Sequence, residues 1–125
     1  MKLATGVDLI EIARIELVMS RQGKAWLERI FTSAEQEYCG KRAESLAGRW
    51  AAKEAVAKAL GSGIGDVSWK EIEILGDEQN APVLKLYGAA ESKARELGLT
   101  TWSVSISHSQ SHSVGVAVAF VVAIG

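Results

Sequence analysis

The segment Gly48–Gly65, GRWAAKEAVAKALGSGIG, reads as a helix built mostly of Ala, Leu, Val and Trp. Three charged residues interrupt this apolar pattern: Lys53, Glu54 and Lys58. Glu54 and Lys58 are one turn apart and share a helix face, whereas Lys53 points elsewhere. Glu54 and Lys58 either form an exposed ion pair or bind a ligand that their small neighbours admit. In the second case Glu54 would hold a metal and Lys58 would contact a phosphate.

Hydrophobic periodicity on both sides of this helix predicts an α+β protein. Residues 45–60 form the helix, Gly61 is its C-terminal cap, and a capping box of Thr32 and Glu35 starts an earlier helix near residue 33. The remaining expected elements are a strand at 3–10, a helix at 11–23, a hairpin of strands at 68–75 and 83–87, a helix at 88–98, and strands at 101–107 and 113–124 around a loop at 108–112. This order implies one domain over residues 1–125, with a mostly antiparallel sheet packed on helices.

Composition limits the possible functions. The chain has 125 residues, with 14 Lys and Arg against 15 Asp and Glu, so no basic excess points to nucleic acid or to an anionic membrane. Its single cysteine, Cys39, excludes an intrachain disulfide and a cysteine-based zinc site. The apolar run at 114–125 is too short to span a bilayer as a helix, and no signal-peptide pattern precedes Asp8. We therefore expect a soluble cytoplasmic protein.

A carboxylate inside an apolar strand needs a partner. Asp8 lies in the run GVDLI, where an unpaired charge would be costly to bury. It faces solvent, caps the following helix, or pairs with Glu54 around a cation. Sequence spacing does not show that the two carboxylates meet.

Two further features have ordinary and functional interpretations. GSGIGD lacks the P-loop lysine and follows a helix, so Gly63 either shapes a loop or lets the backbone approach a nucleotide. His108 and His112 have a spacing that suggests zinc only on a helix, and here we place them in a loop. We expect His108, just past a strand end, to contact a phosphate, and His112 to lie in an exposed loop.

Four motifs together resemble the holo-[acyl-carrier-protein] synthases, the small single-domain group of 4′-phosphopantetheinyl transferases. In order they are GVDLIEIARIE, RIFTSAEQEYC, LAGRWAAKEAVAKALGSGIG and SVSISHS. The resemblance covers nearly the whole chain. It implies Mg²⁺-dependent transfer of phosphopantetheine from coenzyme A to a serine of acyl carrier protein, a step of fatty acid biosynthesis that releases adenosine 3′,5′-bisphosphate. It also implies a homotrimer with active sites at the subunit interfaces.

The resemblance also implies roles for individual residues. Asp8 and Glu54 would hold Mg²⁺, Lys58 would neutralise phosphate oxygens, and Glu54 or a metal-activated water would take the serine proton. The expected contacts to coenzyme A are Arg49 and His108 at its phosphates, and Gly63 and Ile64 beside its nucleotide.

The acidic carrier protein needs a local basic surface on this nearly neutral chain. Arg14, Arg21 and Lys24, which we place on the first long helix, supply one, although such charges are commonly a solvated helix face. One departure from the family is the turn NAP at 80–82, where Gly-Lys-Pro is usual. Two rival functions share these residues: a non-catalytic module that binds coenzyme A or a nucleotide, and a Mg²⁺-dependent nucleotide phosphohydrolase.

Overall fold

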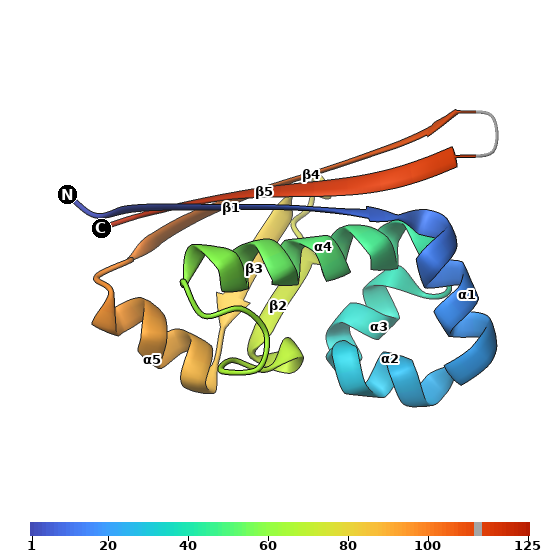
Figure 1. Cartoon of the computed structure of the whole chain (residues 1–125), viewed down its shortest axis with the longest axis horizontal. Helices are drawn as coiled ribbons and strands as arrows, with labels where there is room; N and C mark the ends of the chain where they lie inside the picture. The colour runs from blue at the N-terminus through green and yellow to red at the C-terminus, as the bar shows by residue number, and fades with distance from the viewer. Residues whose placement is uncertain (112–113) are drawn as a thin grey trace.

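The computed structural model describes residues 1–111 and 114–125, and it has a sheet layer on a layer of helices (Figure 1). The elements in chain order are β1 (Leu3–Glu11), α1 (Ile12–Gln22), α2 (Lys24–Ile30), α3 (Ser33–Cys39), α4 (Ala43–Ala59), the 3₁₀ helix η1 (Trp69–Glu71), β2 (Ile72–Gly76), β3 (Pro82–Leu86), α5 (Gly88–Glu96), β4 (Thr101–Ser111) and β5 (Val114–Ile124). The α+β class predicted from the sequence is confirmed.

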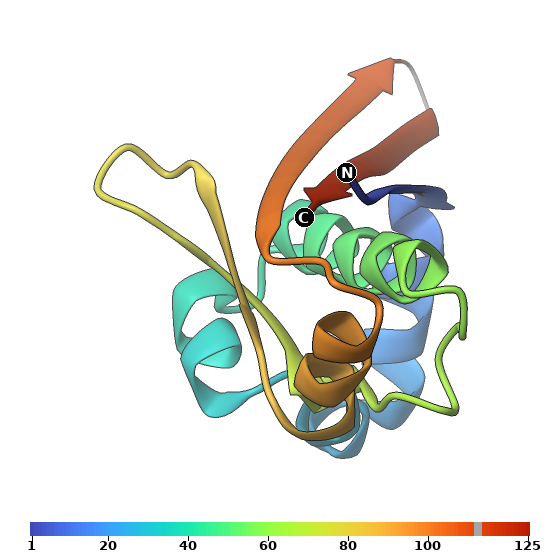
Figure 2. The ribbon, with the colours of Figure 1, turned by 90° about the vertical axis from the view of Figure 1, so that its left-hand side faces the viewer.

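Strand β5 is the centre of a three-stranded antiparallel sheet. The strand order is β1-β5-β4, so β1 and β4 are the two edges. Asp8 on β1 lies opposite Ala119, and His108 on β4 lies opposite Ala117. Strands β2 and β3 form a separate two-stranded antiparallel hairpin, which leans away from β4 (Figure 2). The sequence therefore predicted the pairing direction correctly but not the division into two sheets.

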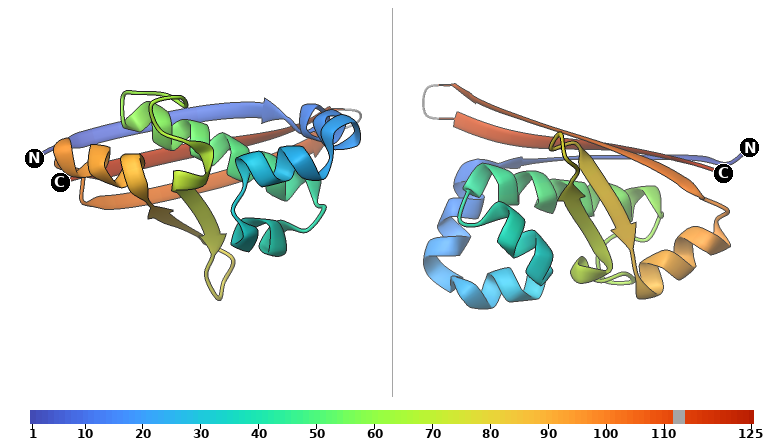
Figure 3. Two further views of the ribbon diagram at one scale, coloured as in Figure 1. Left: turned by 90° about the horizontal axis from the view of Figure 1, so that it is seen from below. Right: turned by 180° about the vertical axis from the view of Figure 1, so that it is seen from behind.

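A glycine lets β1 lie directly on α4. A Cβ atom at Gly6 would stand 1.8 Å from the carbonyl oxygen of Ala55, a separation that no side chain tolerates. Because alternate residues of a strand share a face, Asp8 also faces the helix. Most of α4 is buried, since the sheet covers one side and the hairpin and α3 cover the other (Figure 3).

A fully buried ion pair holds the opposite side of α4. Lys53 and Glu35 are both completely excluded from solvent, with 2.7 Å between Nζ and Oε1. Lys53 also donates to the carbonyl oxygens of Trp69 and Ile72, while Glu35 accepts from the backbone N–H of Ile74. Burial lowers the pKa of Lys53, and the charge of Glu35 opposes that shift. The pair therefore fastens α3, α4 and the start of the hairpin together.

Local signals predicted several elements correctly. The capping box is present, because Thr32 Oγ1 accepts from the Glu35 backbone and Glu35 Oε1 accepts from the Thr32 backbone. Helix α4 ends at Ala59, and Gly61 adopts a positive φ of 76° as a C-terminal glycine does.

Other elements differ from the prediction. Helix α2 was missed, because Gly23 ends α1 at a φ of 56° and a new helix of only seven residues follows without a side-chain cap. The predicted strand at 68–75 begins with η1. The alternation there also fails at Glu73, which is buried because its carboxylate accepts from the hydroxyls of Thr32 and Tyr87.

The loop predicted at 108–112 is wrong over residues 108–111. The polar run HSQS continues β4, and each of its residues pairs with β5, from His108 opposite Ala117 to Ser111 opposite Val114. Polar residues fit an edge strand whose side chains are exposed to solvent. The prediction of a loop was wrong because it relied on the polarity of these residues alone. His112 lies outside the described residues.

The face of the large sheet that points away from the helices is bare; over β1 and β5 it is largely apolar, whereas β4 contributes Ser103, Ser105 and Ser107 to it. Along this face Val7 lies opposite Phe120, and Leu9 lies opposite Val118. Phe120 is 46% exposed. The helices described here cover only the other face (Figure 3), and none of them is both long and apolar enough to cross a membrane.

We predict that Glu35→Gln lowers the free energy of unfolding by about 3–5 kcal/mol, because it leaves the Lys53 ammonium buried without its counter-charge. Glutamine keeps the capping box, so the effect isolates the charge. Urea unfolding at one protein concentration measures it. Glu91→Gln, which breaks the exposed Glu91–Arg95 pair, is the matched control and should change stability by less than about 1 kcal/mol. Equal effects of the two variants would contradict the role of the buried pair.

Candidate functional site

Asp8, Glu54 and Lys58 converge where β1 crosses α4. Lys58 Nζ lies 3.0 Å from Asp8 Oδ1 and also donates to the carbonyl oxygen of Val7 at 3.0 Å. The ion pair of Lys58 is thus with Asp8, on a distant part of the chain, and is not the helical pair with Glu54. Lys58 remains half exposed, so its ammonium can still meet a ligand.

Asp8 and Lys58 both influence the ionisation of Glu54. Burial raises the pKa of Glu54, the negative charge of Asp8 raises it further, and Lys58 partly opposes both. Two carboxylates and a single ammonium leave one net negative charge at this point. The site therefore attracts a cation.

One oxygen of Asp8 is buried without a partner. Asp8 Oδ2 receives no hydrogen bond from residues 1–111 or 114–125. An unpaired buried carboxylate oxygen is costly, and a cation would satisfy it. The described residues contain no group of three or more His, Cys, Asp or Glu side chains arranged to hold a metal. The two carboxylates of Asp8 and Glu54 suit Mg²⁺, because this ion takes one or two protein carboxylates and completes its coordination with phosphate oxygens and water.

A second, basic cluster lies at the other edge of the sheet. Arg49 and His108 line one cavity of about 340 Å³, together with Tyr38, Arg42, Glu44, Ser45, Asn80 and Ile106. Arg49 is largely buried, donates to the Ile74 carbonyl and Ser45 Oγ at 3.4 Å each, and lies 4.7 Å from the centre of the Tyr38 ring. Two arginines, Arg42 and Arg49, and the hydroxyls of Tyr38 and Ser45 suit a phosphate, and the arginines outnumber the one carboxylate of the cavity, Glu44.

The two clusters do not meet within one chain. Asp8 is on edge strand β1 and His108 is on edge strand β4, with β5 between them. Two strand spacings separate these edges by about 10 Å. Helix α4 lies beneath the sheet and carries Glu54 toward one cluster and Arg49 toward the other. A single copy therefore presents the two clusters at opposite edges of the sheet.

The other predicted residues lie outside both clusters. Gly63 and Ile64 are in the loop after α4, and neither lines the basic cavity. Gly63 has a φ of 71°, a left-handed conformation that the loop requires and that glycine adopts readily. Arg14 and Arg21 are exposed on α1, which begins four residues after Asp8. Lys24, predicted on the same helix, is instead the first residue of α2 and pairs with Glu28 at 3.7 Å.

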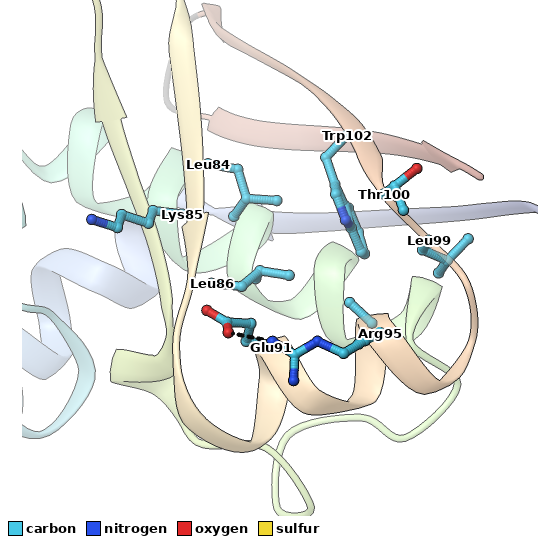
Figure 4. A pocket seen from close by; sticks show the side chains of 9 residues that line it. Leu84, Lys85, Leu86, Glu91, Arg95, Leu99, Thr100 and Trp102 are labelled. Atoms are coloured by element: carbon cyan, nitrogen blue, oxygen red, sulfur yellow. Dashed lines mark hydrogen bonds and ion pairs between the residues drawn. The ribbon is translucent and has the colours of Figure 1, made fainter.

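A further cavity, of about 390 Å³, contains none of the predicted residues (Figure 4). It lies between β3, α5 and the start of β4. Leu84, Leu86 and Trp102 point into it, whereas Lys85 points away. Its one ion pair, between Glu91 and Arg95 at 2.8 Å, is neutral overall. This cavity offers no concentration of charge for a phosphate.

Sequence reasoning missed six of the eight residues that line the basic cavity, among them Tyr38, Arg42 and Asn80. Arg42 comes just before α4 and seven residues before Arg49, a spacing that puts both on one helix face and could have indicated it. Tyr38 and Asn80 reach the cavity from α3 and from the hairpin turn. The only signal for them was the unusual NAP sequence.

Known proteins are similar to this chain in both sequence and fold. The chain is similar to the holo-[acyl-carrier-protein] synthase of Herpetosiphon aurantiacus, with 52% identity over 130 residues, covering 98% of this chain and 99% of the relative. A crystal structure of the Helicobacter pylori holo-[acyl-carrier-protein] synthase in complex with coenzyme A matches with a TM-score of 0.83 and 36% identity, covering 96% of this chain and 99% of that one.

The Bacillus anthracis holo-(acyl-carrier-protein) synthase, in complex with coenzyme A (3′,5′-ADP), matches with a TM-score of 0.70 and 37% identity over 96% of this chain and 94% of that one. The family model described as the 4′-phosphopantetheinyl transferase superfamily matches residues 4–119. Since that match spans nearly all of the sequence, the chain belongs to the 4′-phosphopantetheinyl transferase superfamily.

Proposed function

We propose that this protein is a holo-[acyl-carrier-protein] synthase. It transfers the 4′-phosphopantetheine group of coenzyme A to a serine of apo acyl carrier protein and releases adenosine 3′,5′-bisphosphate, a cytoplasmic step of fatty acid biosynthesis. The observation that carries the proposal is the convergence of Asp8, Glu54 and Lys58 in a member of this superfamily. We treat residues 1–125 as one transferase domain.

The transfer exchanges one oxygen–phosphorus bond for another. The serine Oγ of the carrier protein attacks the phosphorus that bears the pantetheine arm and forms the new bond. The bond from that phosphorus to the bridging pyrophosphate oxygen breaks, and adenosine 3′,5′-bisphosphate leaves with the electron pair. The serine proton passes to Glu54, whose raised pKa makes it a better base, or to water. Lys58 neutralises charge on the phosphate oxygens.

We assign the metal site to Asp8 and Glu54. The unpaired Asp8 Oδ2 and the net negative charge of the cluster support a divalent cation there. Mg²⁺ bound to these carboxylates would polarise the pyrophosphate and offset the charge that develops on the leaving group.

The basic cavity is our proposed site for a phosphate of coenzyme A that lies far from the transferred group. Coenzyme A carries a pyrophosphate and a separate ribose phosphate, so one molecule can contact two separate charge clusters. Arg49 and His108 would hold the ribose phosphate. Gly63 and Ile64 keep their proposed place beside the nucleotide, supported by the resemblance alone.

We propose that the protein is a homotrimer in which neighbouring copies complete each site. The separation of the Asp8 and His108 edges supports a shared site. The bare apolar sheet face supports self-association, because a patch of this kind in water usually marks an interface. The number three comes from the resemblance to the family.

The carrier protein is proposed to dock on α1. Arg14 and Arg21 are exposed there, and Leu17, which is 48% exposed, lies between them on the same helix. Because α1 follows β1 directly, a partner bound to it lies near Asp8. Lys24 extends this basic surface from α2.

We predict that mass spectrometry will find apo carrier protein converted to its phosphopantetheinylated form in the presence of coenzyme A and Mg²⁺. Asp8→Ala and Glu54→Ala should each slow this conversion by roughly two orders of magnitude or more, because charge stabilisation at the reacting phosphate is lost. Both variants should remain folded by circular dichroism and should lose Mg²⁺-dependent binding of coenzyme A in calorimetry.

Asp66→Ala, which removes an exposed carboxylate near the end of α4, is the control and should keep full activity. Hydrolysis of coenzyme A without modification of the carrier would indicate the phosphohydrolase. Binding without either reaction would indicate a non-catalytic module.

Sedimentation equilibrium at micromolar concentration should give three times the 13.4 kDa mass of one chain. Phe120→Glu puts a charge at the centre of the apolar sheet face and should shift the mass toward the monomer. Val83→Glu, at a similarly exposed valine of β3, should leave the trimer intact. A monomer for the unmodified protein would refute the proposed assembly.

Replacing both Arg14 and Arg21 with Glu should raise the KM for carrier protein by at least about tenfold at low salt, because opposed charges become like charges. The increase should shrink as salt screens the surface, and the KM for coenzyme A should stay nearly constant. The control is Lys93→Glu with Arg95→Glu, which makes the same change in net charge on α5. If the α1 and α5 variants behave alike, α1 is not the docking surface.

A further inference from the structure

The ring of Tyr38 is closely packed. The guanidinium of Arg49 lies 4.7 Å from its centre, within the range of a cation–π contact. Gly76, at the end of β2, lies against the hydroxyl end of the ring, where a Cβ atom would stand only 2.3 Å from the Tyr38 hydroxyl oxygen. The ring therefore fits only because residue 76 has no side chain.

The hydroxyl of Tyr38 is held by the hairpin turn. Tyr38 Oη donates to Asn80 Oδ1 at 3.0 Å, and we call this hydrogen bond the Tyr38–Asn80 latch. Asn80 has a φ of 62°, a left-handed conformation that glycine adopts freely and that asparagine tolerates better than most residues. Asparagine thus keeps the turn and adds an acceptor that glycine lacks.

These contacts act on the basic cavity. Tyr38, Arg49 and Asn80 all line it, and they come from α3, α4 and the turn of the hairpin. The groups that hold Arg49 are a ring, a carbonyl and a hydroxyl, and no ion pair of the described residues includes it. The guanidinium is therefore fixed in direction while its positive charge stays available.

We propose that Tyr38 and Asn80 are positioning residues for coenzyme A. The latch holds the hairpin turn at the cavity mouth and keeps the Tyr38 ring under Arg49, so that the arginine is oriented before the phosphate arrives. Pre-organisation of this kind improves affinity by reducing the entropy lost on binding. The inference rests on the proposed function, because it takes the ribose phosphate of coenzyme A as the occupant.

The test is a pair of variants that remove the latch without disturbing the backbone. Asn80→Gly suits the positive φ, and Tyr38→Phe retains the aromatic ring while removing the hydroxyl that donates to Asn80. Each should raise the KM for coenzyme A, and the dissociation constant of adenosine 3′,5′-bisphosphate in calorimetry, by roughly three- to tenfold. The kcat and the KM for carrier protein should not change. The double variant should be no worse than the stronger single one, since both remove the same bond.

Two further variants separate positioning from general stability. Gly76→Ala has an allowed backbone and should reproduce the rise in KM by displacing the Tyr38 ring. Tyr87→Phe removes a hydrogen bond to Glu73 elsewhere in the hairpin and should leave the KM for coenzyme A unchanged. An unchanged KM and nucleotide affinity in Asn80→Gly, or an equal rise in Tyr87→Phe, would overturn the proposal. Because nucleotide binding is measured directly, that result stays distinct from an absence of transferase activity.

Discussion

The close approach of β1 to α4 at Gly6 is the constraint on which the rest of the structure depends. No other residue fits there, because a side chain would occupy the position of the Ala55 carbonyl. The contact brings Asp8, two residues further along the same strand face, within reach of Lys58 and Glu54. A carboxylate in an apolar strand is thereby given both a cationic partner and a second carboxylate. The candidate metal site is thus a consequence of backbone packing.

The charges of the apolar helix α4 have separate roles. Lys53 faces away from the sheet and forms the buried ion pair with Glu35. This pair fixes α3 and the hairpin against the helix. Glu54 and Lys58 face Asp8, and Arg49 faces the Tyr38 ring. One helix therefore orients both halves of the proposed site, and the buried pair keeps the hairpin wall of the basic cavity in place.

The sequence predicted features set by local chemistry, such as the capping box at Thr32 and the glycine end of α4. The resemblance favoured the pairing of Asp8 with Glu54, which spacing cannot reveal because the two residues are 46 positions apart in the sequence. The sequence failed where tertiary contacts override local pattern. Polar residues from His108 to Ser111 extend a strand because β5 pairs with them, and Asn80 faces Tyr38 only once the hairpin has folded.

The central claim is that each active site combines the Asp8 edge of one copy with the His108 edge of another. Co-expression of Asp8→Ala chains with chains carrying Arg49→Gln and His108→Ala tests it most directly, because mixed trimers contain some interfaces with neither lesion. Each mixed trimer has one interface in three without either lesion, so transfer by purified mixed trimers should recover to roughly a third of the unmodified rate, although each parent is nearly inactive. Mixed trimers no more active than their parents would show that both clusters must belong to the same chain.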